Sequence, residues 1–192
     1  MTDSEKAKML RGDPYIASDP VLTEERRRAR RLLHRLNVEQ PLGLPGDNAE
    51  IVRELLPNAQ PPTWLQSPFY CDYGTHIHLG GDVYLNFNCV ILDCAVVTIG
   101  AGTQIGPNVQ IYAATHTLEA EPRRRAVELA KPVTIGEDCW IGGGAIICPG
   151  VTLGDRCVIG AGAVVTHDIP DDSFAAGNPA RVIRSIDQSA AA

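Results

Sequence analysis

The sequence predicts a mainly β protein, built as a parallel β-helix of about four coils with a small helical subdomain at its N-terminal end. Three observations predict this fold class. Large aliphatic residues recur every six positions through most of the chain, glycine follows many of them, and a small or β-branched residue stands two positions before each. Such repeats outweigh local propensities, because one short unit cannot bury its own apolar face without its neighbours.

The composition excludes several classes of protein. A chain of 192 residues suits one sizeable domain, with or without a small appendage. Its net charge of −6 argues against nucleic acid as a partner, because binding a polyanion is driven by basic residues. No run of 18 apolar residues is present, so we expect no membrane span, and the first residues lack the apolar core of a secretory signal. We therefore expect a cytoplasmic protein.

Residues 1–58 are predicted to form the helical subdomain. Apolar residues at helical spacing predict a helix from Glu24 to about Asn37, with Thr23 as its N-terminal cap. A second, short helix is predicted from Asn48 to Leu56, before the chain reaches several prolines. The first helix carries many arginines, which we interpret as a solvated face with salt bridges to neighbouring glutamates rather than as a nucleic-acid site.

Residues 59–184 are predicted to form the β-helix, and residues 185–192 a C-terminal tail. Six residues suit one short strand and one tight turn, so three units can close a triangular coil. The large aliphatic residues would fill the coil interior, and glycine would allow positive φ and close approach at the corners. The twelve aliphatic positions are Leu79, Leu85, Ile91, Ile99, Ile105, Ile111, Ile135, Ile141, Ile147, Leu153, Ile159 and Val165.

The six-residue phase breaks in two places. Two extra residues fall between Ile91 and Ile99, around Asp93 and Cys94. A longer stretch without the pattern, residues 113–131, is rich in charged residues and contains His116. Long loops on rigid scaffolds often carry function, so this insertion is the first candidate for a site.

The six cysteines are expected to be reduced. No Cys-x-x-Cys pair occurs, which argues against zinc ribbons and thioredoxin-like chemistry. Cys89, Cys139 and Cys157 each occupy the small-residue position of the repeat, and we expect them to fill the core rather than to act as nucleophiles.

Several phrases of the sequence resemble one family. The stretch PVTIGEDCWIGGGAIICPGVTLGDRCVIGAGAVVTHDIPDDSFAAGNPARVIR, the phrase FYCDYGTHIHLGGDVYLNFN and the triplet ATH at 114–116 look like the bacterial maltose and galactoside O-acetyltransferases, and like nodulation-type sugar acetyltransferases. The N-terminal part resembles their helical maltose-acetyltransferase domain. The resemblance implies a left-handed β-helix, a homotrimer with active sites between neighbouring subunits, and acetyl-CoA bound along the crevice, with no metal.

The resemblance also implies roles for particular residues. His116 matches the catalytic histidine, and imidazole suits a general base because it titrates near neutral pH. Acceptor contacts are implied for Asp72, Asn86, Asp93 and Glu128. Asp93 lies at the first phase break, which we expect to push its carboxylate out of the coil towards His116. Contacts with acetyl-CoA are implied for Gly143, Ala161, Thr166, His167, Arg181 and Arg184, with Gly143 in place of a serine and His167 in place of a lysine found in some relatives. Trp140 differs from the residue usual in the family, and we expect it either to flank the crevice beside acetyl-CoA or to pack in the core.

Several alternatives stay open. A zinc-dependent hydratase of the carbonic anhydrase type uses the same coil, and His76, His78 and His116 would supply three imidazoles. A non-catalytic scaffold is a second alternative. Asn86 could instead be a corner residue with positive φ, and the two C-terminal arginines could simply face solvent. Maltose, glucose, β-galactosides, chitin oligosaccharides and xenobiotics all remain possible acceptors.

Overall fold

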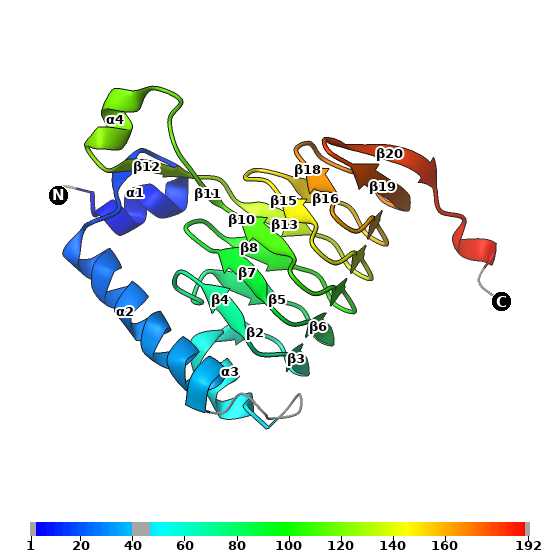
Figure 1. The fold of residues 1–192 in the computed structure, drawn as a ribbon, viewed down its shortest axis with the longest axis horizontal. Helices are drawn as coiled ribbons and strands as arrows, with labels where there is room; N and C mark the ends of the chain where they lie inside the picture. Colours follow the sequence, from blue (N-terminus) through cyan, green and yellow to red (C-terminus); the bar gives the residue numbers. More distant parts are fainter. Residues whose placement is uncertain (1–2, 40–46, 191–192) are drawn as a thin grey trace.

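The computed structural model describes residues 3–39 and 47–190. The chain winds as a left-handed parallel β-helix around three flat sheets, with the helices along one side and at the N-terminal end (Figure 1). This confirms the predicted fold class. None of the helices in the described part of the chain is long and apolar enough to cross a membrane.

Each coil contributes one strand to each sheet, in the chain order sheet 1, sheet 2, sheet 3. Sheet 1 contains β2 (Asn58–Ala59), β5 (Ile77–Leu79), β8 (Val97–Ile99), β13 (Val133–Ile135) and β16 (Thr152–Leu153). Sheet 2 contains β3 (Thr63–Leu65), β6 (Val83–Leu85), β9 (Gln104–Ile105), β14 (Trp140–Ile141), β17 (Val158–Ile159), β19 (Ser173–Gly177) and β20 (Ala180–Ser185). Sheet 3 contains β4 (Phe69–Cys71), β7 (Cys89–Leu92), β10 (Gln110–Tyr112), β15 (Ile146–Ile147) and β18 (Val164–Val165).

The twelve repeat units form the four coils from β5 to β18, as predicted. A further coil, β2 to β4, lies beneath them and pairs in parallel with the first repeat coil. It lacks the regular glycine spacing, so the sequence pattern did not reveal it. At the other end β19 continues sheet 2, and β20 folds back on it antiparallel.

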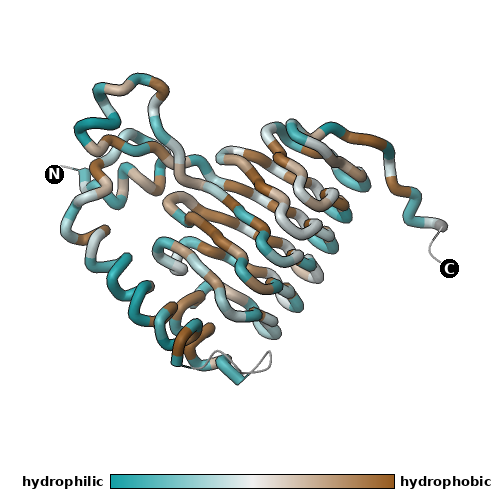
Figure 2. Tube along the Cα trace, in the orientation of Figure 1, coloured by the Kyte–Doolittle hydropathy of each residue, from teal (hydrophilic) through white to brown (hydrophobic). Residues whose placement is uncertain are grey.

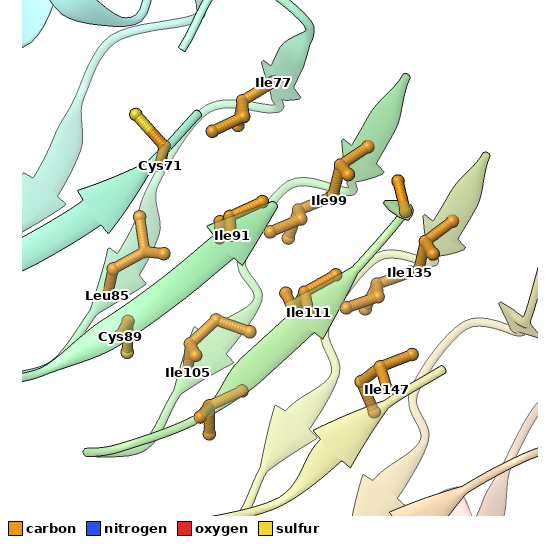
Figure 3. Close-up of a cluster of buried hydrophobic side chains, with 14 of the residues drawn as sticks. Cys71, Ile77, Leu85, Cys89, Ile91, Ile99, Ile105, Ile111, Ile135 and Ile147 are labelled. Carbon is orange, nitrogen blue, oxygen red and sulfur yellow. The ribbon is translucent and has the colours of Figure 1, made fainter. Parts of the chain in front are cut away.

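The core is a stack of like residues inside the coils. Ile91, Ile111 and Ile147 lie in register on three successive strands of sheet 3, and Figure 3 shows them in line. All twelve repeat aliphatics are at most 2 % exposed. Cys89, Cys139 and Cys157 are buried as predicted, so the thiols serve as core fillers. Figure 2 shows the resulting apolar stripes along the coils.

The glycines that follow the repeat aliphatics allow the backbones of neighbouring coils to approach closely, as predicted. They do not have positive φ, so that part of the prediction was wrong. A Cβ on Gly100 would lie 2.5 Å from the backbone nitrogen of Glu137 in the next coil. Positive φ falls two residues later at the corners, for example at Asn88 and Asn108, where φ is 59°. Asparagine tolerates this conformation better than most residues.

Replacing Gly100 with alanine should therefore lower the free energy of unfolding by about 1–3 kcal/mol, because backbone rather than a flexible side chain occupies the space. Gly81→Ala is the matched control, since its Cβ would meet nothing closer than 3.4 Å. Both variants should be compared with the parent by chemical denaturation at one protein concentration. Equal stabilities of the two variants would contradict this account of the corner.

Over its described residues, 3–39 and 47–58, the helical subdomain contains α1 (Glu5–Arg11), α2 (Pro20–His34) and α3 (Ala49–Leu55), with a π-helical turn, η1 (Arg35–Glu39), after α2. Helix α1 was not predicted from the sequence. Helix α2 begins earlier than predicted, because its N-terminal cap is Asp19 and not Thr23. The Asp19 carboxylate accepts hydrogen bonds from the backbone N–H groups of Val21 and Leu22, and proline favours the first helical position.

The arginines of α2 form salt bridges, as predicted, but several also fix the helix to the rest of the protein. Arg27 and Arg31 pair with Glu24, at 3.5 and 3.2 Å. Glu25 pairs with Lys6 of α1 instead. Arg26 donates to the hydroxyl of Tyr73, which precedes β5, so α2 is attached to a corner of the β-helix.

The insertion at 113–131 is ordered. It contains β11 (Ala114–Thr115), α4 (Ala120–Arg124) and β12 (Val127–Ala130), and β12 lies between β11 and β1 (Tyr15–Ile16) in a three-stranded antiparallel ribbon. Figure 1 shows this ribbon reaching from the β-helix to α1. A short 3₁₀ turn, η2 (Gln188–Ala190), follows β20.

Candidate active site at two corners of the coil

His116 directly follows β11, and Glu128 lies on β12, the antiparallel partner of β11. Ala114 pairs with Ala130 and Thr115 with Leu129, so one further step in this antiparallel register sets His116 opposite Glu128. Residues directly opposite in an antiparallel pair point to the same face. His116 is exposed, and the Glu128 carboxylate accepts a hydrogen bond of 2.9 Å from the hydroxyl of Tyr15.

A polar cluster continues from Glu128 to the corner between sheets 3 and 1. The Asp72 carboxylate lies 3.5 Å from the thiol of Cys94 and 3.8 Å from the guanidinium of Arg30 on α2. Burial raises the pKa of the Asp72 carboxyl above its usual value. Burial also raises the pKa of Tyr15, with further contributions from the adjacent Cys94 and Glu128. These effects connect Asp72, Cys94, Tyr15 and Glu128 into one cluster.

Asp93 does not point out of the coil towards His116, so that expectation is wrong. Its side chain has no exposed surface, and its carboxylate accepts the backbone N–H groups of Asp72, Tyr73 and His76 at 3.0, 2.9 and 3.2 Å. The turn between β4 and β5 leaves these donors without strand partners, and buried donors must be satisfied. Burial raises the pKa of Asp93. Asp93 thus fixes the turn that presents Asp72.

A second group of predicted residues lies at the corner between sheets 2 and 3. Asn86 directly follows β6, and Gly143 and Ala161 lie one position further along this corner, two residues after β14 and β17. Asn86 does not have positive φ; Asn88 is the left-handed residue here. The Asn86 side-chain oxygen accepts from the N–H of Phe87 at 2.7 Å. The indole of Trp140 points outward from sheet 2 beside this corner and is 58 % exposed.

The remaining predicted residues lie at the C-terminal end of the β-helix. Thr166 and His167 follow β18 at the corner between sheets 3 and 1, and the Thr166 hydroxyl is 2.9 Å from Nδ1 of His167. Arg181 and Arg184 lie on β20, both exposed. The guanidinium of Arg184 lies 5.8 Å from the ring centre of Phe174 on β19, which holds it over the strand.

One chain thus places its candidate residues on two opposite edges of sheet 3. His116, Glu128 and Asp72 lie at the edge next to sheet 1, whereas Asn86 and Gly143 lie at the edge next to sheet 2. Strands of this sheet are two to four residues long, at about 3.3 Å per residue. The strands alone therefore place the two groups of one chain about 7–13 Å apart.

Sequence reasoning did not identify Tyr15, Cys94 or Arg30 as members of this cluster. Cys94 had a signal, because it stands at the first phase break beside Asp93. No sequence signal marks Tyr15 or Arg30, because each reaches the site only through packing of the helical subdomain against the insertion and the coil.

The three histidines of the hydratase alternative do not meet within one chain. Nδ1 of buried His76 lies 2.8 Å from the Asp93 carbonyl, while His78 points outward from sheet 1. Over residues 3–39 and 47–190, no group of three or more His, Cys, Asp or Glu side chains is arranged to hold a metal ion.

Two family models match parts of this chain. Residues 8–60 match the maltose acetyltransferase hexapeptide capping motif, and residues 132–167 match the hexapeptide repeat of succinyl-transferase. Nodulation protein L of Rhizobium meliloti (strain 1021) is 51 % identical over 186 residues, which cover 95 % of this chain and 99 % of that protein.

Solved structures extend the likeness to the whole fold. A maltose O-acetyltransferase from Clostridium difficile 630 is 40 % identical with a TM-score of 0.91, covering 98 % of this chain and 100 % of that one. A galactoside acetyltransferase in complex with coenzyme A is 35 % identical with a TM-score of 0.90, covering 98 % and 94 %. The fold, the capping motif and these identities together show that this chain belongs to the maltose and galactoside O-acetyltransferase family of hexapeptide-repeat proteins.

Proposed function

We propose that this protein transfers an acetyl group from acetyl-CoA to a hydroxyl group of a sugar, with His116 as the general base. The observation that carries the proposal is the position of His116 opposite Glu128, beside a partly buried cluster of acidic and hydroxyl groups suited to a polar acceptor. The bound coenzyme A of the galactoside acetyltransferase relative supports the choice of donor.

The reaction needs a base, a site for the oxyanion and two aligned substrates. His116 takes the proton of the sugar hydroxyl as its oxygen attacks the thioester carbonyl carbon. The carbon–sulfur bond of the tetrahedral intermediate then breaks, and His116 returns the proton to the thiolate of CoA. We assign stabilisation of the oxyanion to the backbone N–H of Gly143, since this residue has no side chain to donate. Five of the six cysteines are buried and Cys148 is half-buried, which leaves direct transfer as the simpler route.

The acceptor side of the site is assigned to Asp72, Glu128 and Asn86. Sugars are recognised by side chains that hydrogen-bond several hydroxyl groups, and these three offer two carboxylates and one amide. Tyr15 already uses one oxygen of Glu128, which fixes the direction of that carboxylate. The buried Asp93 supports Asp72 through the backbone and is assigned no contact with the acceptor.

The donor side is assigned to the corner between sheets 2 and 3 and to the C-terminal end. Gly143 and Ala161 have small side chains or none, so the backbone at this corner is accessible. The extended, amide-rich pantetheine arm of CoA can lie against it, with Trp140 at its side. Thr166 and His167 are assigned to the same ligand. Arg181 and Arg184 are both exposed on β20, and their charges suit the phosphate groups of CoA.

A homotrimer would complete the site. The outward side chains of sheet 3 are mostly apolar, including Val90, Ile146 and Val164, whereas those of sheet 1 include Thr98 and Thr134. If sheet 3 of each copy faces a common threefold axis, the sheet 2 corner of one copy meets the sheet 1 corner of the next. His116 of one subunit then lies beside Gly143 of its neighbour.

Mixing two inactive variants tests this shared site. His116→Ala removes the base, and Ala161→Trp fills the exposed donor corner without entering the core. Each variant alone should be inactive. After the two are denatured and refolded together, random trimers should recover about a quarter of wild-type activity, because every mixed trimer contains one intact site. A site contained within one subunit would give no recovery.

The proposed activity is tested by supplying acetyl-CoA with a panel of acceptors and following the release of free thiol. The panel contains glucose, maltose, a β-galactoside and N-acetylglucosamine, with glucosamine as a probe for transfer to an amine. Thiol release that depends on a sugar, with an acetyl ester in the product, supports the proposal. Release that no hydroxyl acceptor stimulates contradicts it.

A further inference from the structure

The outer surface of sheet 2 carries an aromatic platform below the candidate acceptor site. Trp64 of β3 is 38 % exposed and lies in register with Tyr84 of β6, and Tyr84 is in register with Gln104 of β9. These three side chains, with Asp82 and Gly102, line a hollow of about 360 Å³. None of the roles assigned above uses this hollow.

The ring of Trp64 is held in place rather than free to rotate. Its indole Nε1 donates a hydrogen bond of 2.9 Å to the Asp82 carboxylate. Asp82 itself occupies a corner with φ of 60°, which fixes the position of the acceptor. A fixed, half-exposed indole surrounded by hydrogen-bonding groups costs little entropy when it receives a ligand.

The chemistry of the hollow suits a sugar. An aromatic face stacks on the apolar C–H face of a pyranose ring, while carboxylate, phenol and amide groups hydrogen-bond its hydroxyls. Asp82, Tyr84 and Gln104 supply these three groups around Trp64. A purely apolar ligand would leave them unpaired, at a cost in free energy.

The hollow and the candidate acceptor site are linked by strand β6. Tyr84 lies on this strand and Asn86 directly follows it, whereas Asp82 and Gly102 line the hollow at the other end, at the corner between sheets 1 and 2. From Asp82 to Asn86 the strand direction covers about 13 Å. Trp64 lies one strand away from Tyr84, at about 4.8 Å. From Trp64 to Trp140 there are three strand spacings, or about 14 Å. A monosaccharide held at Asn86 does not fill the Asp82 end of the hollow, but an oligosaccharide that follows the strand can occupy both places.

We propose that the Trp64 hollow is a remote subsite for a second or third sugar unit, so that the preferred acceptor is an oligosaccharide. This inference rests on the proposed function, because it extends the acceptor site of that reaction. Binding energy from the remote unit is expected to hold the reacting sugar in place without touching the reacting atoms.

The experiment compares sugars of matched chemistry and different length. Glucose is paired with maltotriose, and N-acetylglucosamine with chitotriose. Wild-type protein should show the higher kcat/KM for a trisaccharide. Trp64→Ala should lower kcat/KM for that trisaccharide by about tenfold, mainly through KM, while the matching monosaccharide is little affected. Trp64→Phe should lose less, since it keeps an aromatic face. Thr134→Ala, an outward change on sheet 1, is the surface control.

Two results would overturn the inference. One is an unchanged ratio of trisaccharide to monosaccharide kcat/KM in Trp64→Ala. The other is a lower oligomeric state of that variant in light scattering, which would make Trp64 a subunit contact.

A binding measurement separates this inference from the proposed function. Calorimetric titration of His116→Ala with each trisaccharide does not depend on turnover, and binding should weaken in the double variant with Trp64→Ala. If a trisaccharide binds in a Trp64-dependent way but the wild-type protein transfers no acetyl group, the proposed function is wrong and the subsite is supported. If the protein acetylates monosaccharides but trisaccharide binding does not depend on Trp64, the subsite is wrong and the proposed function is supported.

Discussion

Replacing His116 with alanine should lower kcat by at least about two orders of magnitude, because a sugar hydroxyl is a poor nucleophile until a base removes its proton. His116 is exposed on the insertion and contributes nothing to the core, so the variant should fold and assemble as the parent does. The rate is followed by thiol release at saturating acetyl-CoA, and binding of CoA is followed separately by thermal shift.

His78→Ala is the matched control for this experiment. Its ring points outward from sheet 1, so the variant should keep the parent rate. The pair of variants also separates acyl transfer from the zinc hydratase alternative, which uses both histidines. Equal losses in both, together with zinc bound in stoichiometric amount, would favour the hydratase. A His116→Ala variant with near-parental turnover would remove this residue from the mechanism.

Replacing Asp93 with alanine should lower the free energy of unfolding by about 3 kcal/mol or more. The change leaves three backbone N–H groups without an acceptor, two of them buried, and each unsatisfied buried donor costs about 1–3 kcal/mol. The turn that presents Asp72 should loosen as well, so activity should fall through KM for the acceptor. Chemical denaturation at a fixed protein concentration and acceptor kinetics measure the two effects.

Two further variants calibrate the Asp93 result. Asp93→Asn keeps one oxygen acceptor for the turn and should lose less stability than the alanine variant. Asp187→Ala removes an exposed carboxylate near the C-terminal end and should change stability little. An Asp93→Ala variant as stable as Asp187→Ala would show that the buried carboxylate does not hold the turn.

The repeats made the β-helix predictable. Every aliphatic position named from the six-residue period is buried, because an outward aliphatic in one coil would break the stack above and below it. The coil from β2 to β4 escaped prediction for the opposite reason. It lies at the end of the stack, where only one neighbouring coil constrains its residues, and Gln60 and Gln66 stand where the repeat has glycine.

The helical subdomain shows where local signals compete. Thr23 and Asp19 both qualify as N-terminal caps by residue type. The helix begins after Asp19 because Pro20, which follows it, is preorganised for the first helical position. The residues of α1 carry little amphipathic pattern over a short span. Only Met9 of that helix is buried, so packing against the ribbon, and not periodicity, decides its place.

The candidate site was predictable in its residues but not in its arrangement. His116 and Glu128 were both expected on the insertion, yet nothing in their spacing sets them opposite each other. The pairing of β11 with β12 does so. The direction of Asp93 was predicted wrongly, because a phase break indicates that a residue leaves the regular pattern without indicating which unpaired backbone groups it must satisfy.

By itself the sequence determined the coil, its core and the part of the chain that interrupts it, because a six-residue repeat admits only one stacking of apolar side chains. The tertiary structure decided which polar groups meet. Contacts such as Tyr15 with Glu128 and Asp72 with Cys94 join segments far apart along the chain. They arise from the fit of whole elements, which local spacing does not encode.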